Sequence, residues 1–156
     1  MASVEIDQLD ALVSEIGFLN SKLLLLIGGP GAGKSRLIAE LSKRRSVPVL
    51  NVGASLGAVL LLKPTVRRRV EAANLLRELA DRSAIHNLLL LDNLELLFDR
   101  TLELNPIDLL KRLAHARSVV AVWPGDLQNG RLSYGAAAHP EHRDYGVEGL
   151  VPFIIH

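Results

Sequence analysis

Eight consecutive residues have the types and spacing that hold a chain of phosphates: Gly28, Gly29, Pro30, Gly31, Ala32, Gly33, Lys34 and Ser35. They match the G-x-x-x-x-G-K-[ST] pattern at every fixed position. Glycines let backbone N–H groups turn inward around phosphate oxygens, because no Cβ stands in the way. Lys34 supplies a mobile positive charge for the β- and γ-phosphates, and the Ser35 hydroxyl is suited to Mg²⁺. The motif therefore predicts an ATP and Mg²⁺ site over 28–35, to which we add the next residue, Arg36.

The residues on both sides of this loop give it the required context. The apolar run 23–27 is too short for a typical helix and predicts a buried parallel strand. Apolar residues at helical spacing follow the loop and predict a helix to about Lys43. Such a helix directs the positive end of its dipole at the phosphates. The alternative, a glycine-rich turn with an incidental lysine, does not account for both flanks.

A second motif is a run of four leucines, 88–91, that ends in Asp92. In P-loop proteins a strand of this kind lies beside the strand of the phosphate loop. Its terminal Asp then holds Mg²⁺ from the other side, often through water. We therefore predict that Ser35 and Asp92 are the two protein groups at the metal.

The residue after this aspartate is unusual for an ATPase. Hydrolysing AAA+ proteins usually place Glu there to polarise the attacking water, and this chain has Asn93. An amide positions water but does not accept its proton. Glu95 is the candidate base, with Asp99 farther along and a plain surface glutamate as the alternative. Hydrolysis is thus predicted to be slow, completed by another subunit, or not the purpose of the site.

Other residues around the predicted strand ends complete the hypothesis. Trp123 stands where such ATPases put a polar residue that senses the γ-phosphate, and core packing is its expected role. A neighbouring subunit often supplies an arginine to the γ-phosphate. Of the two arginines before the last strand, Arg131 and Arg143, we favour Arg143, although a surface arginine is the alternative. His139 and His142 lack a third ligand at metal spacing, so no zinc site is predicted.

Three consecutive arginines, Arg67, Arg68 and Arg69, fall in the first turns of a helix predicted over 64–82. Cations at the start of a helix are unfavourable, because they lie next to the positive end of its dipole, so these three arginines suggest a binding role. They are candidate contacts for DNA phosphates or for a neighbour's acidic face, and an ordinary solvated surface is the alternative. The predicted apolar stripe of this helix comprises Val66, Val70, Ala73, Leu76 and Leu79 or Ala80.

The order of predicted elements defines the fold class. Strands are predicted at 22–27, 47–52, 87–92, 118–123 and 150–155, the second at an edge because of Pro48, with a polar loop over 126–146. An amphipathic helix over 1–17 precedes them, and helices or loops separate them. This alternation predicts one α/β domain over 1–156, with a mostly parallel five-stranded sheet, helices on both faces and no lid after the last strand. Ile16 or Phe18 is a candidate adenine contact, with core packing as the alternative.

Composition limits the remaining classes. The chain has 156 residues, no cysteine, a net charge of +1 and a mean hydropathy of +0.24. No apolar run approaches the roughly 18 residues of a membrane span, and the acidic start is no secretory signal. A cytoplasmic location, no thiolate metal site and no general electrostatic attraction to nucleic acid are expected. The surplus of leucine favours a protein interface as an additional use of the surface.

Taken together, the chain resembles the BrxF family, the small P-loop proteins of type 3 BREX phage-defence systems. The likeness rests on the loop at 28–35, the block 88–99, the segment 122–125 and His139-Pro140-Glu141. It implies an ATP-binding subunit of a multi-protein system that recognises foreign DNA. In such a family, an asparagine at the position of Asn93 would be a shared feature of its members and not the result of a mutation that inactivates the site. More remotely, the chain looks like a minimal AAA+ core.

Three functions compete at this point. The first is a nucleotide-dependent assembly switch, in which ATP and Mg²⁺ drive homo-oligomerisation and engagement of DNA or larger defence proteins. The second is a small nucleotide or nucleoside kinase, which needs arginines that close over both phosphate donors. The third is an adaptor that holds nucleotide without turnover.

Overall fold

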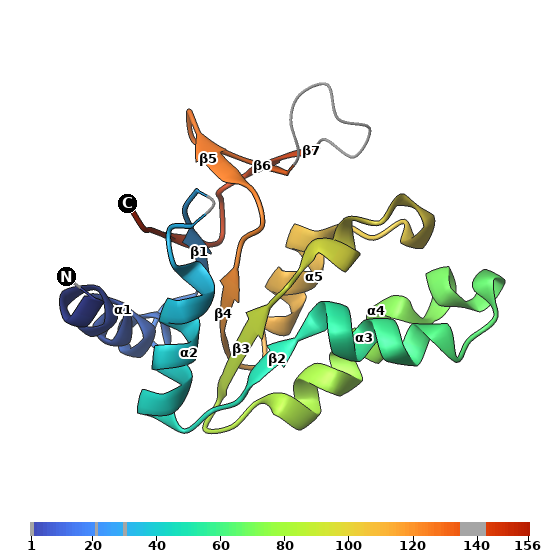
Figure 1. The fold of residues 1–156 in the computed structure, drawn as a ribbon, viewed down its shortest axis with the longest axis horizontal. Coiled ribbons are helices and arrows are strands. Elements are labelled where there is room, and N and C mark those ends of the chain that lie inside the picture. Colours follow the sequence, from blue (N-terminus) through green and yellow to red (C-terminus); the bar gives the residue numbers. More distant parts are fainter. Residues whose placement is uncertain (1, 21, 30, 135–142) are drawn as a thin grey trace.

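Five parallel strands form the central sheet of the computed structural model, which describes residues 2–20, 22–29, 31–134 and 143–156 (Figure 1). The strand order is β2-β3-β4-β1-β8, and every pairing between neighbours is parallel. The strands are β1 (Leu23–Ile27), β2 (Val49–Asn51), β3 (Leu88–Asp92), β4 (Ser118–Val122) and β8 (Val151–Ile154). The predicted α/β class and five-stranded sheet are confirmed, and β2 lies at an edge as Pro48 indicated.

Helices cover both faces of this sheet, as predicted (Figure 1). One face packs against α1 (Ala2–Ile16) and α2 (Lys34–Arg45). The other packs against α3 (Val52–Leu61), α4 (Thr65–Ser83) and α5 (Pro106–Leu113). In β1, Leu24 and Leu26 belong to the first core, while Leu23, Leu25 and Ile27 belong to the second. Because both faces are buried, the strands read as continuous apolar runs instead of alternating patterns.

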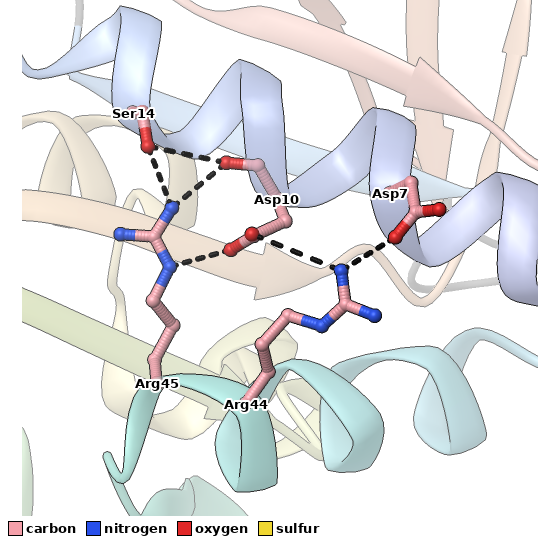
Figure 2. A network of polar contacts seen from close by, with 5 residues as sticks. All are labelled: Asp7, Asp10, Ser14, Arg44 and Arg45. Carbon is pink, nitrogen blue, oxygen red and sulfur yellow. Dashed lines mark hydrogen bonds and ion pairs between the residues drawn. The ribbon is translucent and has the colours of Figure 1, made fainter.

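The first helix, α1, packs against α2 through both apolar and polar side chains. Its buried face comprises Ile6, Leu9, Val13 and Ile16, which confirms the predicted amphipathic helix. On the solvent side, Arg44 pairs with Asp7 at 2.6 Å, and Arg45 pairs with Asp10 at 2.5 Å and donates to the Ser14 hydroxyl at 2.8 Å (Figure 2). Exposed ion pairs each contribute about 0–1 kcal/mol, so the apolar face supplies most of the stability here.

The predicted apolar stripe of α4 is partly wrong. Its buried residues are Ala72, Leu76 and Ala80, whereas Val66 and Val70 are 78% and 68% exposed. Both valines belong to the first turns of α4, which project beyond the sheet together with the end of α3 (Figure 1). Helical spacing predicted a stripe along the whole helix, but burial follows the sheet and ends with it.

The segment after β4 was predicted as a polar loop, and this prediction is wrong. It contains a three-stranded antiparallel sheet formed by β5 (Asp126–Gln128), β6 (Arg131–Tyr134) and β7 (Arg143–Gly146). Asn129 and Gly130 join β5 to β6 with φ of 53° and 72°. Two consecutive positive φ values at Asn-Gly are typical of a hairpin turn, so the sequence did hold a signal for this element. The strands of three and four residues were too short to recognise by alternation.

Two short 3-10 helices, η1 (Glu95–Phe98) and η2 (Arg100–Leu102), connect β3 to α5. η1 brings Glu95 close to the end of β3, where the second motif lies. Among the residues that the structure describes, no helix is long and apolar enough to cross a membrane.

Candidate nucleotide-binding site

The glycine loop joins the end of β1 to the start of α2. Gly31 and Gly33 have φ of 79° and 92°, a region in which residues with a Cβ are strained. A Cβ at Gly28 would lie 2.9 Å from that of Ala32 and 3.0 Å from the carbonyl oxygen of Ile155. The N-cap of α2 is Gly33, which has no side chain that could accept from the first N–H groups of the helix. These N–H groups are therefore available to an anion.

A pocket of about 620 Å³ lies beside this loop, at the carboxyl edge of the sheet. It gathers four predicted site residues, Lys34, Ser35, Asp92 and Glu95. The other lining residues are Asn51, Asn93, Val122, Pro124 and Tyr134. The carboxyl ends of parallel strands are where ligands bind in α/β sheets, so the location agrees with a phosphate site.

Of the described residues in the predicted set 28–36, Lys34 and Ser35 line the pocket, and the others lie outside its wall. Arg36 lies on the exposed side of α2, 3.7 Å from Glu40, and is not in the pocket wall. Gly29 lies in the loop with open space around the position of a Cβ. Pro30 falls outside the described residues.

Lys34 is a positively charged residue in the pocket wall, and negatively charged side chains lie around it. Its Nζ donates a hydrogen bond of 2.9 Å to the carbonyl oxygen of Trp123. Burial lowers the pKa of Lys34, and the negative charges of Glu95, Asp92 and Asp126 oppose that shift. A partly desolvated ammonium held by a neutral carbonyl is well placed to exchange this bond for a charged phosphate oxygen. Asp126, at the start of β5, was missed by sequence reasoning because its segment was predicted as a loop.

The position of β3 corrects one prediction. The strand that ends in Asp92 does not lie beside β1, because β4 lies between them and pairs with both. Register still brings the ends together: Leu26 pairs with Val122, and Leu91 pairs with Ala121, so Asp92 ends level with Val122. Val122 and Asp92 both line the pocket, so the carboxylate of Asp92 faces the same cavity as Lys34 and Ser35.

Asn93 is held by contacts that involve two strands. Its φ is 57°, and its Nδ2 donates to the Oδ1 of Asn51 at 2.9 Å. The same Oδ1 accepts from the N–H of Ala54 and so caps α3. A Cβ at Gly53 would lie 2.5 Å from Asn93 Nδ2, so a larger residue there would displace this amide. Asn51 was missed by sequence reasoning, since its contact with residue 93 comes from the pairing of β2 with β3.

Asn93→Glu is expected to destabilise the fold by about 2 kcal/mol and to leave ATP turnover slow. Asparagine tolerates the left-handed backbone at this position, whereas glutamate pays a strain of roughly 1–2 kcal/mol there. The substitution also breaks the amide contact with Asn51. Urea unfolding and steady-state ATPase assays measure both effects, and Asn93→Gly is the control that relieves the strain. A fast ATPase with unchanged stability would contradict the interpretation.

Four aromatic rings form a cluster beside the pocket, and one of them, Tyr134, is in its wall. Trp123 is fully buried, which confirms its predicted core role, and its Nε1 donates to the carbonyl oxygen of Ser133 at 3.1 Å. Phe98 stacks on Tyr134 with 3.9 Å between ring centroids and meets Trp123 edge-on at 5.4 Å. Tyr145 meets Trp123 edge-on at 5.8 Å. Because η1 begins at Glu95 and ends at Phe98, this cluster joins the candidate base to the hairpin that carries Tyr134.

The other predicted site residues are the arginine expected from a neighbouring subunit, two histidines and two candidate adenine contacts. The backbone of Arg143 pairs with Tyr134 across β6 and β7, its side chain lies outside the described residues, and its role in a neighbour's site stays a prediction. His139 and His142 also lie outside them. Ile16 and Phe18 do not approach the pocket, because they connect to the amino end of β1. Ile16 is fully buried in the core, and Phe18 is 93% exposed.

Each arginine of the triplet has a partner within the chain. Arg68 donates to the carbonyl oxygens of Leu60 and Lys63 at the end of α3. Arg67 pairs with Glu71 at 3.2 Å, and Arg69 pairs with Glu103 at 3.3 Å. The side chains of Arg67 and Arg69 are 63% and 57% exposed, so these two pairs are weak in water.

Comparison with known proteins supports the fold. No protein-family model and no curated protein sequence matches the chain. PCH-2 from C. elegans has a similar solved structure, with a TM-score of 0.53 and 16% identity over 97% of this chain and 41% of that one. AMPPCP-bound DnaA from Aquifex aeolicus matches with a TM-score of 0.45 and 18% identity, over 74% and 36% of the two chains. The chain thus spans less than half the length of either protein.

Fold, strand order and glycine loop together define a P-loop NTPase fold of the AAA+ type. The loop residues described above lie where this fold places a nucleotide. At these identities the likeness concerns the fold alone, so the function has to be argued from the site.

Proposed function

We propose that the protein binds ATP with Mg²⁺ and uses the bound nucleotide to control its assembly with further copies. The observation that carries this proposal is the pocket in which Lys34, Ser35, Asp92 and Glu95 meet at the carboxyl edge of the sheet. Residues as far apart in sequence as Lys34 and Glu95 line the same pocket there. A glycine loop with left-handed Gly31 and Gly33 opens beside them.

The residues present fit a nucleotide with its magnesium ion. The N–H groups of the loop and of the first turn of α2 would bind phosphate oxygens, and Lys34, whose Nζ donates to the Trp123 carbonyl oxygen, would supply a positive charge to the β- and γ-phosphates. Ser35 and Asp92 would hold Mg²⁺, which keeps several waters and therefore needs few protein ligands. The ion would neutralise phosphate charge.

Turnover is expected to be weak in an isolated subunit. Asn93 orients water through an amide that Asn51 fixes, and Glu95 is the carboxylate in the pocket wall that remains to accept a proton. Stabilisation of charge on the γ-phosphate is assigned to Arg143 of a neighbouring copy. This division makes hydrolysis depend on assembly.

We further propose that the protein is a subunit of a BREX-type phage-defence system in the cytoplasm. Support comes from the resemblance to the BrxF family at 28–35, 88–99 and 122–125. Partners would be other proteins of that system, with DNA as a possible ligand. Of the triplet, Arg67 and Arg69 are the candidates for DNA phosphates, because Arg68 already caps α3.

The proposal is tested by measuring ATP affinity and molecular mass on the same sample. Calorimetry with Mg²⁺ and a non-hydrolysable ATP analogue is expected to show saturable binding that EDTA weakens. Light scattering at micromolar protein is expected to show a larger species only with the analogue. Binding without a change in mass would leave a nucleotide-holding adaptor and remove the switch, and no binding would remove both.

Glu95→Gln is expected to lower ATP turnover by at least tenfold at unchanged ATP affinity. General bases contribute roughly 10²–10⁴ in rate, and glutamine accepts no proton. Glu78→Gln, on the exposed side of α4, is the matched control and is expected to keep the wild-type rate. A wild-type rate in Glu95→Gln would show that another group, or water alone, takes the proton.

A further inference from the structure

The second sheet, formed by β5, β6 and β7, places one tyrosine in the wall of the nucleotide pocket. Tyr134 is the last residue of β6, and it lines the pocket together with Lys34, Ser35, Asp92 and Glu95. Those four residues belong to α2, to the end of β3 and to η1, so Tyr134 is the contribution of a different sheet. The shape of the pocket therefore depends on where the second sheet lies.

The ring of Tyr134 packs on Phe98. The two rings are stacked, with 12° between their planes and 3.9 Å between their centroids. Phe98 is fully buried, whereas Tyr134 is half-buried. Because a tyrosine combines an apolar ring with a polar tip, the ring is suited to this contact and the hydroxyl to the polar side of the residue. The carbonyl oxygen of the preceding residue, Ser133, accepts from Trp123 Nε1 at 3.1 Å, which also fixes the backbone of β6.

The pocket wall has few groups that could donate to a terminal phosphate. Lys34 is the only lysine or arginine that the described part of the chain contributes to it. The hydroxyl of Ser35 is assigned to Mg²⁺, and the amide of Asn93 already donates to Asn51. A γ-phosphate has three terminal oxygens, so the lysine and the metal leave one that needs a further donor. The hydroxyl of Tyr134 is a neutral donor in the same wall.

Tyr134 lies beside the part of the pocket in which hydrolysis is expected. η1 begins at Glu95, the proposed general base, and ends at Phe98, on which Tyr134 stacks. A general base must lie within reach of the water that attacks the γ-phosphate. Since Glu95 and Tyr134 line one pocket, Tyr134 is close to the same end of the nucleotide.

We propose that the hydroxyl of Tyr134 donates a hydrogen bond to the γ-phosphate of ATP, so that the second sheet distinguishes ATP from ADP. ADP has no γ-phosphate and makes only the contacts of the glycine loop and its lysine. β7 pairs with β6 through Arg143 and Tyr134, so the arginine assigned to a neighbouring copy belongs to the adjacent strand. ATP bound in one copy thereby positions the strand that serves the next copy. This inference rests on the proposed ATP function and adds to it the residue that distinguishes the two nucleotides.

Tyr134→Phe tests the hydroxyl, because phenylalanine keeps the ring that stacks on Phe98. Calorimetry with Mg²⁺ compares the affinity for a non-hydrolysable ATP analogue with the affinity for ADP. Since a hydrogen bond to a charged group contributes roughly tenfold or more, the variant is expected to bind the analogue at least tenfold more weakly than the wild type and ADP equally well. Tyr145→Phe is the matched control, because Tyr145 meets Trp123 edge-on but does not line the nucleotide pocket, and should keep both affinities.

The ratio of the two affinities is measured within each folded variant, so it does not depend on a change in stability. An unchanged ratio in Tyr134→Phe, with binding retained, would overturn this inference and leave the ATP function standing. No binding of either nucleotide by the wild type would remove the proposed function and this inference with it. The fluorescence of Trp123 in the wild type decides the matter if Tyr134→Phe does not fold. Because Trp123 bonds to the residue before Tyr134, the analogue is expected to change the emission more than ADP does, and equal changes would overturn the inference.

Discussion

Lys34→Ala is expected to raise the dissociation constant for ATP with Mg²⁺ at least a hundredfold, which equals about 2.7 kcal/mol of binding free energy. The ammonium group lies in a partly buried pocket, where a charged hydrogen bond to phosphate is screened less than at the surface. No other lysine or arginine among the described residues lines that pocket. Calorimetry with a non-hydrolysable analogue gives the affinity directly.

The stability of the same variant distinguishes loss of binding from loss of fold. Burial lowers the pKa of Lys34 in the folded protein, so the unfolded chain binds its proton more tightly. A lysine of this kind opposes folding at neutral pH, and its removal is expected to leave the urea midpoint unchanged or raised. Lys43→Ala, on the exposed side of α2, is the matched control and should keep wild-type affinity. Wild-type ATP affinity in Lys34→Ala would contradict the assignment of the site.

The sequence predicted those parts of the site well that depend on a short stretch of consecutive residues. Gly28 to Ser35 carry their own geometry, because a glycine loop between a strand and a helix has few conformations. Asp92 was recognisable because its strand follows a complete phosphate loop in the same chain, although a buried strand that ends in Asp is weak evidence alone. Glu95 followed from its distance to Asp92, and η1 does bring it into the pocket wall.

The parts that the sequence did not predict depend on which strands become neighbours. Nothing in the local pattern places β4 between β1 and β3, yet that order decides which residues meet Lys34. Asn51 reaches Asn93 only because β2 pairs with β3. Tyr134 reaches the pocket only because a short hairpin packs on Trp123. Val66 and Val70 were predicted to be buried but are exposed, because the apolar spacing of a helix does not indicate where the sheet that it packs on ends.

Gly125→Ala is expected to destabilise the protein by about 3 kcal/mol, because overpacking at a rigid backbone contact has no cheap relief. A Cβ at this position would lie 1.7 Å from the carbonyl oxygen of Ser133 and 2.9 Å from Trp123 Nε1. The hairpin must then move away, which breaks the hydrogen bond between Trp123 and Ser133 and disturbs the stack of Phe98 on Tyr134. Urea unfolding followed by the fluorescence of the single tryptophan, Trp123, measures the loss.

Gly57→Ala is the matched control for this substitution. Gly57 lies within α3, where a Cβ would make an ordinary contact of 3.8 Å with Leu96, and alanine favours a helix over glycine by roughly 1 kcal/mol. Gly57→Ala should therefore stabilise the protein while Gly125→Ala destabilises it. Since the displaced hairpin carries Tyr134 in the pocket wall, Gly125→Ala is also expected to weaken ATP binding under conditions where the protein stays folded. Equal stabilities of the two variants would show that the hairpin does not pack on Trp123 as described, and the link between the aromatic cluster and the site would fall with it.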